Sequence, residues 1–413
     1  MRLLVLTHTF PPSAHSNAKR PFYLVKGFLK AGWHVDVFTS TIGMDARAVE
    51  SIFHPALRIE RRGDPLERIY QKLRAWPTIY RWYGLVWSGL AWPDTTVVWS
   101  RKAIRACANA ANYDRVLVFI LPASLLLVGR QPGRVQRNWI FDYQESVTPH
   151  WRQYPRRSPL NRIGFPRLEK LERRTLSAAG NVIFTAATNR QAYLDAGLVG
   201  ATPTAHFPYF YDADAFREPG QVAADKFQIA YFGTFDWRGA RSPETFLRSL
   251  ANFLAANPAA RPKTEFLFHG NWLAEHDQLL AELKLHDVVS IQPPVPYEQY
   301  VARLKQCPIL LLVVAAQHNL FMPSKIVDYF AVRRPILAFV PRGSEMRQVL
   351  ESAEMAAFTC DEFDVAAGTT ALGRLWQQFE AGTLKDNAGK TEFWSSESQV
   401  PRYVELVSRA EWA

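Results

Sequence analysis

The stretch Pro308–Val340, PILLLVVAAQHNLFMPSKIVDYFAVRRPILAFV, gives the clearest indication of the fold. It opens with an apolar run that is too continuous for a half-exposed strand, and such runs are typical of strands buried on both faces of a parallel sheet. A polar loop, Gln317–Phe321, follows, and then Pro323 and Ser324 mark a helix start at which Ser324 could cap. Because Ile336–Val340 is a second apolar run, the stretch predicts strand, loop, helix and strand.

This loop should lie at the carboxyl edge of the sheet, where open α/β folds bind their ligands. Free backbone N–H groups at a helix N-terminus, joined by the Lys325 ammonium, suit a diphosphate. Asp328, one turn further along, could accept hydrogen bonds from sugar hydroxyls. An ordinary buried βαβ unit with a solvated lysine would show the same residues, so on these alone both interpretations stay open.

The segment PSKIVDYFAVRRPILAF resembles the nucleotide-sugar loop of retaining GT-B glycosyltransferases of family four, in which Pro-Ser-Lys, an acidic residue, Tyr and a later Pro follow in this order. The resemblance implies an α/β protein with two Rossmann-like, doubly wound domains facing a cleft. It places Ser324 and Lys325 at the donor diphosphate and Asp328 at the ribose. Further donor contacts are expected from His318, Asn319, Leu320 and Pro323. Leu320 stands where the family often has a Glu that contacts the donor sugar, so the sugar contact is unassigned.

The beginning of the chain predicts a βαβ unit, with an apolar run at Arg2–Thr7, helical spacing at Asn17–Ala31 and another strand at Val35–Thr39. The loop after the first strand, THTFPPSAHSNAKR, resembles the family's opening loop, which is followed by an Arg or Lys on the helix. Family members often have a Gly-Gly there, which lets the backbone approach the phosphates. Side-chain donors would have to replace it here, so we predict donor or acceptor contacts from Ser16 and Asn17.

A later strand, Asn138–Asp142, carries DYQES at its carboxyl end. In the family this strand end often delivers a His, or an Asp-x-Arg-Asp, into the cleft. The matching position here is Gln144, flanked by Asp142 and Glu145. A carboxylate at this place could bind and orient acceptor hydroxyls or act as a base. Glu145 could instead cap or solvate a loop.

The second domain is expected to open with the strand Phe227–Phe232, followed by the turn GTFDWRGARSPET. Family members place an Arg and a Lys of this turn on the donor diphosphate. Here Gly233 and Thr234 begin the turn, and Thr234 occupies the position of the Arg. Arg238 and Arg241 are therefore the predicted substitutes, although a surface role is open for either one.

The loop QPPVPYEQY resembles the family's nucleobase pocket, with backbone contacts near Pro294 and Val295. Residues 206–225 are rich in Pro, Gly and small polar residues, as in a linker. We therefore expect an acceptor domain at 1–205, a donor domain at 206–398 and a terminal helix at 399–413 that crosses back to the first domain. The linker contains an Asp-x-Asp, Asp212 and Asp214, but this pair precedes a turn, so no metal site is predicted.

Composition supports two domains, because 413 residues with 48% apolar side chains can form two cores. The net charge of +11 suits nucleic acid, an anionic membrane or an anionic small ligand. Three widely spaced cysteines form neither a disulfide framework nor a zinc motif. The chain begins directly with a strand and has no apolar run long enough to span a bilayer, so we expect a cytoplasmic protein.

Two basic segments, residues 64–105 and 150–174, suggest a partner surface. The first mixes arginines and lysines with many aromatic residues, and the second is nearly free of acids until Glu169. The aromatic residues are Tyr70, Trp76, Tyr80, Trp82, Tyr83, Trp87, Trp92 and Trp99. Interfacial helices need this mixture, whereas packing of a helical hairpin on its own domain would explain it as well. We predict contact with an anionic membrane surface at the cytoplasmic face and no nucleic acid, although single-strand binding uses the same residue types.

The function implied is transfer of a sugar from a nucleoside diphosphate sugar to a hydroxyl of a sugar or lipid-linked acceptor, in bacterial surface polysaccharide or glycolipid synthesis. Negative charge builds on the leaving diphosphate, and Arg238, Arg241 and Lys325 would stabilise it, so no metal or other cofactor is expected. Retention of configuration is implied by the resemblance alone. Two alternatives stay open, a nucleotide-sugar epimerase of the same fold and a basic membrane or nucleic-acid binder without turnover.

Overall fold

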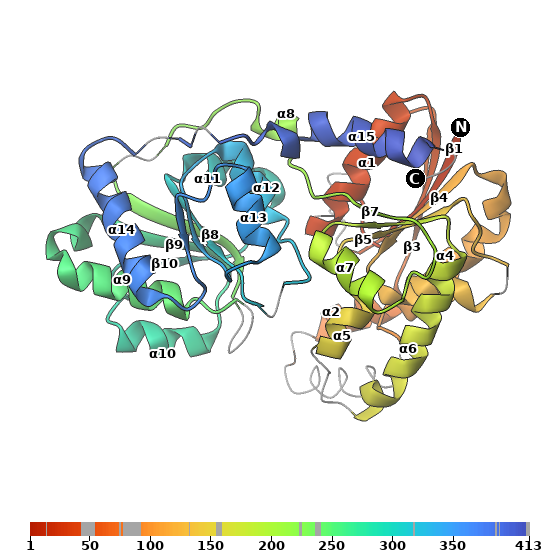
Figure 1. Cartoon of the computed structure of the whole chain (residues 1–413), viewed down its shortest axis with the longest axis horizontal. Helices are drawn as coiled ribbons and strands as arrows, with labels where there is room; N and C mark the ends of the chain where they lie inside the picture. The colour runs from red at the N-terminus through yellow and green to blue at the C-terminus, as the bar shows by residue number, and fades with distance from the viewer. Residues whose placement is uncertain are drawn as a thin grey trace. The chain divides into compact units, whose positions relative to one another are not determined.

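The computed structural model describes residues 1–13, 15–42, 54–73, 76, 92–131, 133–153, 159–222, 225–235, 241–316, 319–384, 386–387 and 389–409. Contacts divide the chain into two compact units (Figure 1). One is Met1–Tyr209 together with Gln399–Ala413, and the other is Phe210–Ser398. Each unit holds one parallel sheet with helices on its faces, so the prediction of two doubly wound α/β domains is confirmed.

The sheet of the first unit has seven strands among the described residues, in the order β3-β2-β1-β4-β5-β6-β7. The strands are β1 (Arg2–Leu6), β2 (His34–Ser40), β3 (Leu57–Arg62), β4 (Arg115–Ile120), β5 (Trp139–Tyr143), β6 (Asn181–Phe184) and β7 (Thr204–His206). From β1 the chain builds outward to β3 and then returns to β4 on the other side. The strand order therefore reverses between β1 and β4, the place where such sheets bind ligands.

The helices of the first unit form because their apolar residues repeat at helical spacing. In α1 (Lys19–Lys30) the buried side chains include Leu24, Val25, Phe28 and Leu29. The others are α2 (Pro65–Leu73), α4 (Val97–Ala106), α5 (Thr148–Gln153), α6 (Pro159–Ala178) and α7 (Ala187–Asp195), with 3-10 turns η1 (Ser16–Ala18), η3 (Cys107–Asn112) and η4 (Ala123–Arg130).

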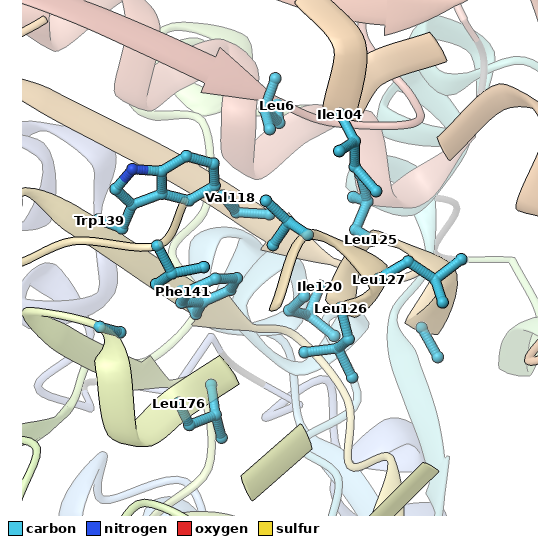
Figure 2. Packing of buried hydrophobic residues seen from close by; sticks show 14 of the residues in the cluster. Leu6, Ile104, Val118, Ile120, Leu125, Leu126, Leu127, Trp139, Phe141 and Leu176 are labelled. Carbon is cyan, nitrogen blue, oxygen red and sulfur yellow. The ribbon is translucent and has the colours of Figure 1, made fainter. Parts of the chain in front are cut away.

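One core cluster lies between the first sheet and α4, η3, η4, α6 and α7. Figure 2 shows Leu6, Val118, Ile120, Trp139 and Phe141 from the strands, which pack with residues of α4, η4 and α6. All five are nearly or completely inaccessible to solvent. The continuous apolar runs of β4 and β5 in the sequence follow from this burial on both faces.

The terminal helix α15 (Ser396–Ser408) packs beside α1 in the first unit (Figure 1). Gly27 of α1 allows this close approach, since a Cβ there would lie 2.1 Å from Cγ1 of Val400. A buried hydrogen bond fixes the helix further, because the Tyr403 hydroxyl donates to Asp142 on β5 at 2.8 Å. The Arg115 side chain donates to the carbonyl of Val407 at 2.9 Å.

The sheet of the second unit has six strands among the described residues, in the order β10-β9-β8-β11-β12-β13. The strands are β8 (Phe227–Thr234), β9 (Thr264–Asn271), β10 (Val289–Gln292), β11 (Ile309–Val313), β12 (Ile336–Phe339) and β13 (Phe358–Cys360). The order reverses between β8 and β11. The helices are α8 (Ala213–Phe216), α9 (Glu244–Ala256), α10 (Ala274–Glu282), α11 (Tyr297–Gln306), α12 (Lys325–Val332), α13 (Glu345–Ser352) and α14 (Val365–Glu380), with 3-10 turns η5 (Pro258–Lys263) and η7 (Glu392–Trp394).

The helices lie on both faces of this sheet, with α9 and α14 side by side on one face and α11 and α12 on the other (Figure 1). The predicted strand, loop, helix and strand of Pro308–Val340 are confirmed as β11, α12 and β12, and every residue of β11 is buried. The prediction that Ser324 caps the helix is wrong. Ser324 has helical backbone angles, and its side chain makes no capping hydrogen bond.

Candidate functional site

The carboxyl edge of the second sheet brings two glycines together where its strand order reverses. Gly233 on β8 has φ +141°, and Gly270, opposite it on β9, has φ +156°. A Cβ on Gly270 would lie 1.6 Å from the carbonyl oxygen of Gly233, and a Cβ on Gly233 would lie 2.9 Å from Nζ of Lys325. The glycines are therefore needed for the close approach of the two strand ends to each other and to α12.

Lys325 is the first residue of α12 and points back over the end of β8. Its Nζ donates a hydrogen bond to the Phe232 carbonyl at 2.8 Å and lies 3.7 Å from the centre of the Tyr231 ring. That ring stacks on Phe235 at 4.1 Å, which keeps it in place. Within the described part of the chain no carboxylate forms an ion pair with Lys325. The ammonium is thus positioned but not neutralised.

Arg241 adds a second positive charge beside Lys325. Burial first, and then the charge of Arg241, hold the pKa of Lys325 well below its usual value. Arg241 is itself half-buried and lies just before α9. Two cations that repel each other at a half-buried place are stabilised when an anion binds there. Arg238, the other predicted cation, lies outside the described residues.

The loop before α12 presents its predicted donor residues to different degrees. Asn319 and Ser324 are exposed, whereas Leu320 and Pro323 are half-buried. The first N–H groups of an eight-residue helix follow directly after Ser324, and the N–H of Ile326 donates to the Pro323 carbonyl at 3.1 Å. His318 lies outside the described residues. The Ala316 N–H at the start of this loop donates to the Glu362 carboxylate at 2.8 Å, a positioning contact that the sequence did not reveal.

Asp328 is more buried than its predicted role at a ribose suggests, with 5% of the residue exposed. It lies near the Tyr300 phenol on α11, and burial, then the negative charge of Asp328, raises the pKa of that phenol. The contact of Asp328 with sugar hydroxyls stays a prediction.

The predicted nucleobase loop lies between β10 and α11, with Pro294 exposed and Val295 half-buried. Sequence reasoning missed His269, which lies near the carboxyl end of β9 and stacks on Phe232 with 5.2 Å between the ring centres. Its Nδ1 is 3.4 Å from the Pro293 carbonyl, and its Nε2 is 3.1 Å from the Arg303 guanidinium. Burial lowers the pKa of His269, so the neutral ring donates from Nδ1 to Pro293 and accepts from Arg303.

In the first unit, Gln144 is buried and Glu145 is exposed at the end of β5. The Gln144 carbonyl accepts hydrogen bonds from the hydroxyls of Thr185 and Tyr209, each at 3.1 Å. Its side-chain oxygen is buried without a partner among the described residues. Such an atom costs free energy until it finds a donor, which makes Gln144 the better candidate of the two for a buried polar contact.

A fully buried carboxylate, Glu172, supports this strand end. It accepts hydrogen bonds from the phenols of Tyr143 at 2.8 Å and Tyr193 at 2.7 Å and from the Thr148 N–H at 3.2 Å. Burial raises the pKa of Glu172. These three bonds connect β5, α5, α6 and α7, so Glu172 fixes the backbone that carries Gln144.

The proposed acceptor role of Asp142 is wrong, because its carboxylate is completely buried. It receives three hydrogen bonds from the Arg20 guanidinium and one from the Tyr403 phenol. Arg20 also donates to the carbonyls of Phe207 and Pro208. The charge of Arg20, the second residue of α1, is therefore neutralised within the protein.

Ser16 and Asn17 form the short turn η1 that precedes α1. Asn17 is half-buried, and its N–H faces Nδ1 of His15 at 3.4 Å. In the linker, Asp212 caps α8 by accepting from the Asp214 N–H, and Asp214 pairs with Arg217. No group of three or more possible metal-binding side chains occurs in the part of the chain that the structure describes.

The predicted membrane contact of the segment 64–105 is wrong for its last aromatic residue. Trp99 is fully buried against Phe38 and His8, so it cannot lie at a membrane surface. Trp92 is half-buried and donates to the Gly164 carbonyl at 3.3 Å, whereas Trp76 is 64% exposed. Residues 77–91 and 154–158 lie outside the described residues. No helix among those described is long and apolar enough to cross a bilayer.

Two parallel α/β units with these strand orders define the GT-B class of folds. No family model matches the chain, and no curated protein matches it in sequence. Solved structures do match along nearly the whole chain. A sucrose-phosphate synthase from Thermosynechococcus elongatus is 16% identical with a TM-score of 0.63, and 98% of each chain is covered.

Two further matches are trehalose-phosphate structures. A UDP-forming α,α-trehalose-phosphate synthase from Burkholderia vietnamiensis is 13% identical with a TM-score of 0.61, covering 98% of this chain and 99% of its own. A structure from E. coli, described as trehalose-6-phosphate bound with UDP-2-fluoro glucose, is 14% identical with a TM-score of 0.61, covering 99% and 96%. At these identities the likeness establishes the fold, and the activity must be argued from the residues.

Proposed function

We propose that this protein is a glycosyltransferase that moves a sugar from a nucleoside diphosphate sugar to an acceptor hydroxyl. The observation that carries the proposal is the pair of Lys325 and Arg241 at the strand reversal of the second sheet. Lys325 has a carbonyl and an aromatic face as its partners, and Arg241 repels it. The similar structures are named as synthases that form UDP or as bound to a UDP-sugar analogue, which supports the same kind of donor.

The reaction requires cations that are already in position beside the diphosphate before the glycosidic bond breaks. The bond between the anomeric carbon and the diphosphate breaks, and its electron pair leaves with the diphosphate while the acceptor oxygen forms the new bond. Lys325, Arg241 and the N–H groups at the start of α12 stabilise the charge that builds on the leaving group. Gly233 leaves room for this group, since a side chain there would meet Nζ of Lys325.

These cations take the place that a metal ion has in other transferases, so we propose a reaction without a metal or other cofactor. Retention of the anomeric configuration belongs to the same proposal, because it comes from the resemblance and from no single residue. Configuration is read by NMR of the product, with the anomeric proton coupling compared with that of the donor.

The proposal is tested by nucleotide release from UDP-, GDP- and ADP-sugars, with and without sugar and lipid acceptors. Lys325→Ala and Arg241→Ala should each lower turnover by about two to three orders of magnitude. Lys263→Ala is the matched control, because Lys263 is exposed, pairs with Glu380 and lies at the opposite, amino edge of the same sheet. Normal rates in both site variants would remove the assignment of the donor site.

The same panel separates the alternatives. A nucleotide-sugar epimerase converts its donor without any acceptor, so an altered sugar nucleotide in the acceptor-free reactions would replace the proposed function. A protein that binds liposomes tightly and turns over no donor would be a binder that keeps the fold. Transfer that requires an acceptor supports the glycosyltransferase.

A lipid-linked acceptor and a place at the cytoplasmic face of the inner membrane are part of the proposal, as is a role in surface polysaccharide or glycolipid synthesis. The support is local. On and just after α2, the exposed apolar side chains of Ile69 (44%) and Trp76 (64%) accompany the exposed cations Arg68 and Lys72. Exposed cations also lie along α6, namely Arg167, Lys170, Arg173 and Arg174. This mixture suits anionic headgroups.

Sedimentation with liposomes tests the membrane contact. Vesicles with a third of phosphatidylglycerol should bind the protein more tightly than pure phosphatidylcholine vesicles, and Ile69→Ser with Trp76→Ser should weaken this binding by about tenfold. Phe363→Ser is the control, because Phe363 is a 78% exposed aromatic residue of the second unit. If both variants bind like the wild type, the segment is packing surface and the membrane proposal fails.

A further inference from the structure

The first unit holds a histidine where its own strand order reverses. His8 follows β1 by two residues, and β1 and β4 are the two strands between which the order changes. Its side chain is 12% exposed. In open α/β sheets, ligands bind outside the carboxyl ends of the strands at such a reversal. The sequence prediction did not use this residue, since it assigned contacts in this loop to Ser16 and Asn17 only.

Two buried side chains hold the His8 ring. The Asp64 carboxylate, which is completely buried, has Oδ2 at 3.5 Å from Nε2 of His8. The indole of Trp99 meets the imidazole edge to face, with 4.7 Å between the ring centres and 74° between the planes. Trp99 is a residue of α4, is completely buried, and packs against Phe38 of β2. An imidazole with a carboxylate at one nitrogen and an indole against its face has a defined orientation.

The loop that carries Asp64 is fastened to its surroundings by three cations. Arg61 donates to the Pro11 carbonyl in the loop after β1, and Lys102 of α4 donates to the Gly63 carbonyl at 3.0 Å. Arg68 donates to the Thr41 hydroxyl at 3.3 Å. These bonds join α2, α4 and the loops after β1 and β2 around one carboxylate. The dyad is therefore built into the unit and is not a chance contact between surface side chains.

Burial decides which nitrogen of His8 can meet a ligand. Nε2 faces Oδ2 of Asp64 at 3.5 Å without a hydrogen bond between the two atoms, and the nearby negative charge favours the proton on Nε2, which leaves the lone pair on Nδ1 as a hydrogen-bond acceptor. Nε2 is sealed from solvent, whereas Nδ1 is not, and Nδ1 has no hydrogen-bond partner among the residues that the structure describes. A fixed acceptor atom of this kind matches the proton of a hydroxyl group.

We propose that His8 binds the acceptor hydroxyl that receives the sugar, by accepting its proton in a hydrogen bond at Nδ1, and that Asp64 and Trp99 position the ring. The ligand class is a sugar or other polyol. The inference rests on the proposed function, because only a transferase needs an acceptor hydroxyl. It assigns the acceptor to the first unit by a residue that contacts it, while Lys325 and Arg241 serve the donor in the second unit.

The first test compares His8→Phe with His34→Phe. Phenylalanine keeps a ring against Trp99 and removes both nitrogens, and His34 is an exposed histidine at the amino end of β2, so it controls for the loss of a histidine in the same unit. His8→Phe should lower kcat/KM for the acceptor by about 10- to 100-fold, the effect of one well-placed hydrogen bond. The Kd of UDP, measured by calorimetry, should not change.

The second test measures the tautomer of the His8 ring, which Asp64 is proposed to set and which loss of packing alone would not change. With ¹⁵N-labelled histidine, the His8 ring of the wild type should show a protonated Nε2 and an unprotonated Nδ1. Asp64→Asn should shift this tautomer balance and lower acceptor kcat/KM by about tenfold, with an unchanged melting temperature. Asp64→Glu should recover part of the activity.

The possible results distinguish the role of His8 from the proposed glycosyltransferase activity. Wild type that binds UDP but transfers sugar from none of the UDP-, GDP- and ADP-sugars to glucose, glucose 6-phosphate or octyl glucoside would overturn the proposed function and this inference with it. Wild-type transfer with equal acceptor kcat/KM in His8→Phe overturns the inference alone. Equal losses in His8→Phe and His34→Phe also overturn it, because the effect would then be general.

Discussion

Nucleotide binding should take up a proton at Lys325, and this can be measured directly. Burial and the charge of Arg241 hold the pKa of Lys325 well below its usual value in the free protein. A diphosphate beside Nζ favours the charged ammonium and raises the pKa again. Between these two pKa values the free protein carries the neutral amine and the complex carries the ammonium. Binding in this pH range therefore removes a proton from the buffer.

The size of the effect follows from a single ionising group. At most one proton is bound per nucleotide, so Kd rises by about tenfold per pH unit inside the range, or about 1.4 kcal/mol. Below the pKa of free Lys325 the ammonium is already present, and Kd is flat. The unbound protein shows the linked effect on folding. The unfolded chain binds this proton more readily than the folded one, so the free energy of unfolding rises with pH through the same range.

Calorimetry of UDP and GDP binding in buffers of different ionisation enthalpy counts the protons. The measurements belong above pH 7.5, where the nucleotide phosphates are fully ionised. Lys325→Met should weaken binding and abolish the proton uptake, whereas Arg241→Ala should move the uptake to higher pH, because the repulsion that lowers the pKa is gone. Binding with no proton uptake from pH 7.5 to 10, in a wild type whose Kd is the same as that of Lys325→Met, would refute the reasoning.

Three further predictions concern the frame around the sites. Gly270→Ala places a Cβ 1.6 Å from the Gly233 carbonyl oxygen, so it should push the strand ends apart and weaken UDP binding by about tenfold or more by calorimetry, whereas an unchanged Kd would mean that the strands move freely. Glu172→Ala leaves two buried phenols without their acceptor and should cost about 3 kcal/mol in urea unfolding, with a loss below 1 kcal/mol arguing against the network. Asp142→Ala should cost about 3–5 kcal/mol by leaving the Arg20 charge buried and unpaired, and the double variant with Arg20→Met should recover part of it, since the unpaired charge rather than the missing contact is the main cost.

The fold was predictable because its signals are local in the sequence. Uninterrupted apolar runs such as Ile309–Val313 occur where a strand is buried on both faces, and the structure buries all five residues. The helix of Lys325–Val332 follows from a proline, a polar turn and helical spacing. The lack of a side-chain cap at Ser324 could not be predicted, because the backbone angles of Ser324 depend on how the preceding loop packs.

The site was predictable only where one residue carries the signal. The motif placed Lys325 at the start of a helix beside the sheet edge, which the structure confirms, while its contact with a diphosphate stays a prediction. The roles of Asp142 and Trp99 were misjudged because their partners are distant in sequence. Asp142 pairs with Arg20, 122 residues away, and with Tyr403, 261 residues away. Contacts over such sequence separations produce no signal in the local sequence pattern. His8 and Asp64 were missed for the same reason, since the dyad exists only after β1, β2 and β3 are aligned.

The two units share a topology, and the different balance of charge at their sheet edges predicts that an anion binds in the second unit. Each has a basic residue near the carboxyl edge of its sheet, Arg20 in the first unit and Lys325 in the second. Arg20 gives its hydrogen bonds to Asp142 and to two carbonyls, so its charge is balanced before any ligand arrives. Lys325 is held by one carbonyl and one ring face, which position a charge without cancelling it. We therefore expect an anion to bind with a more favourable free energy in the second unit. The pair of His8 and Asp64 in the first unit is expected to bind a neutral hydroxyl instead.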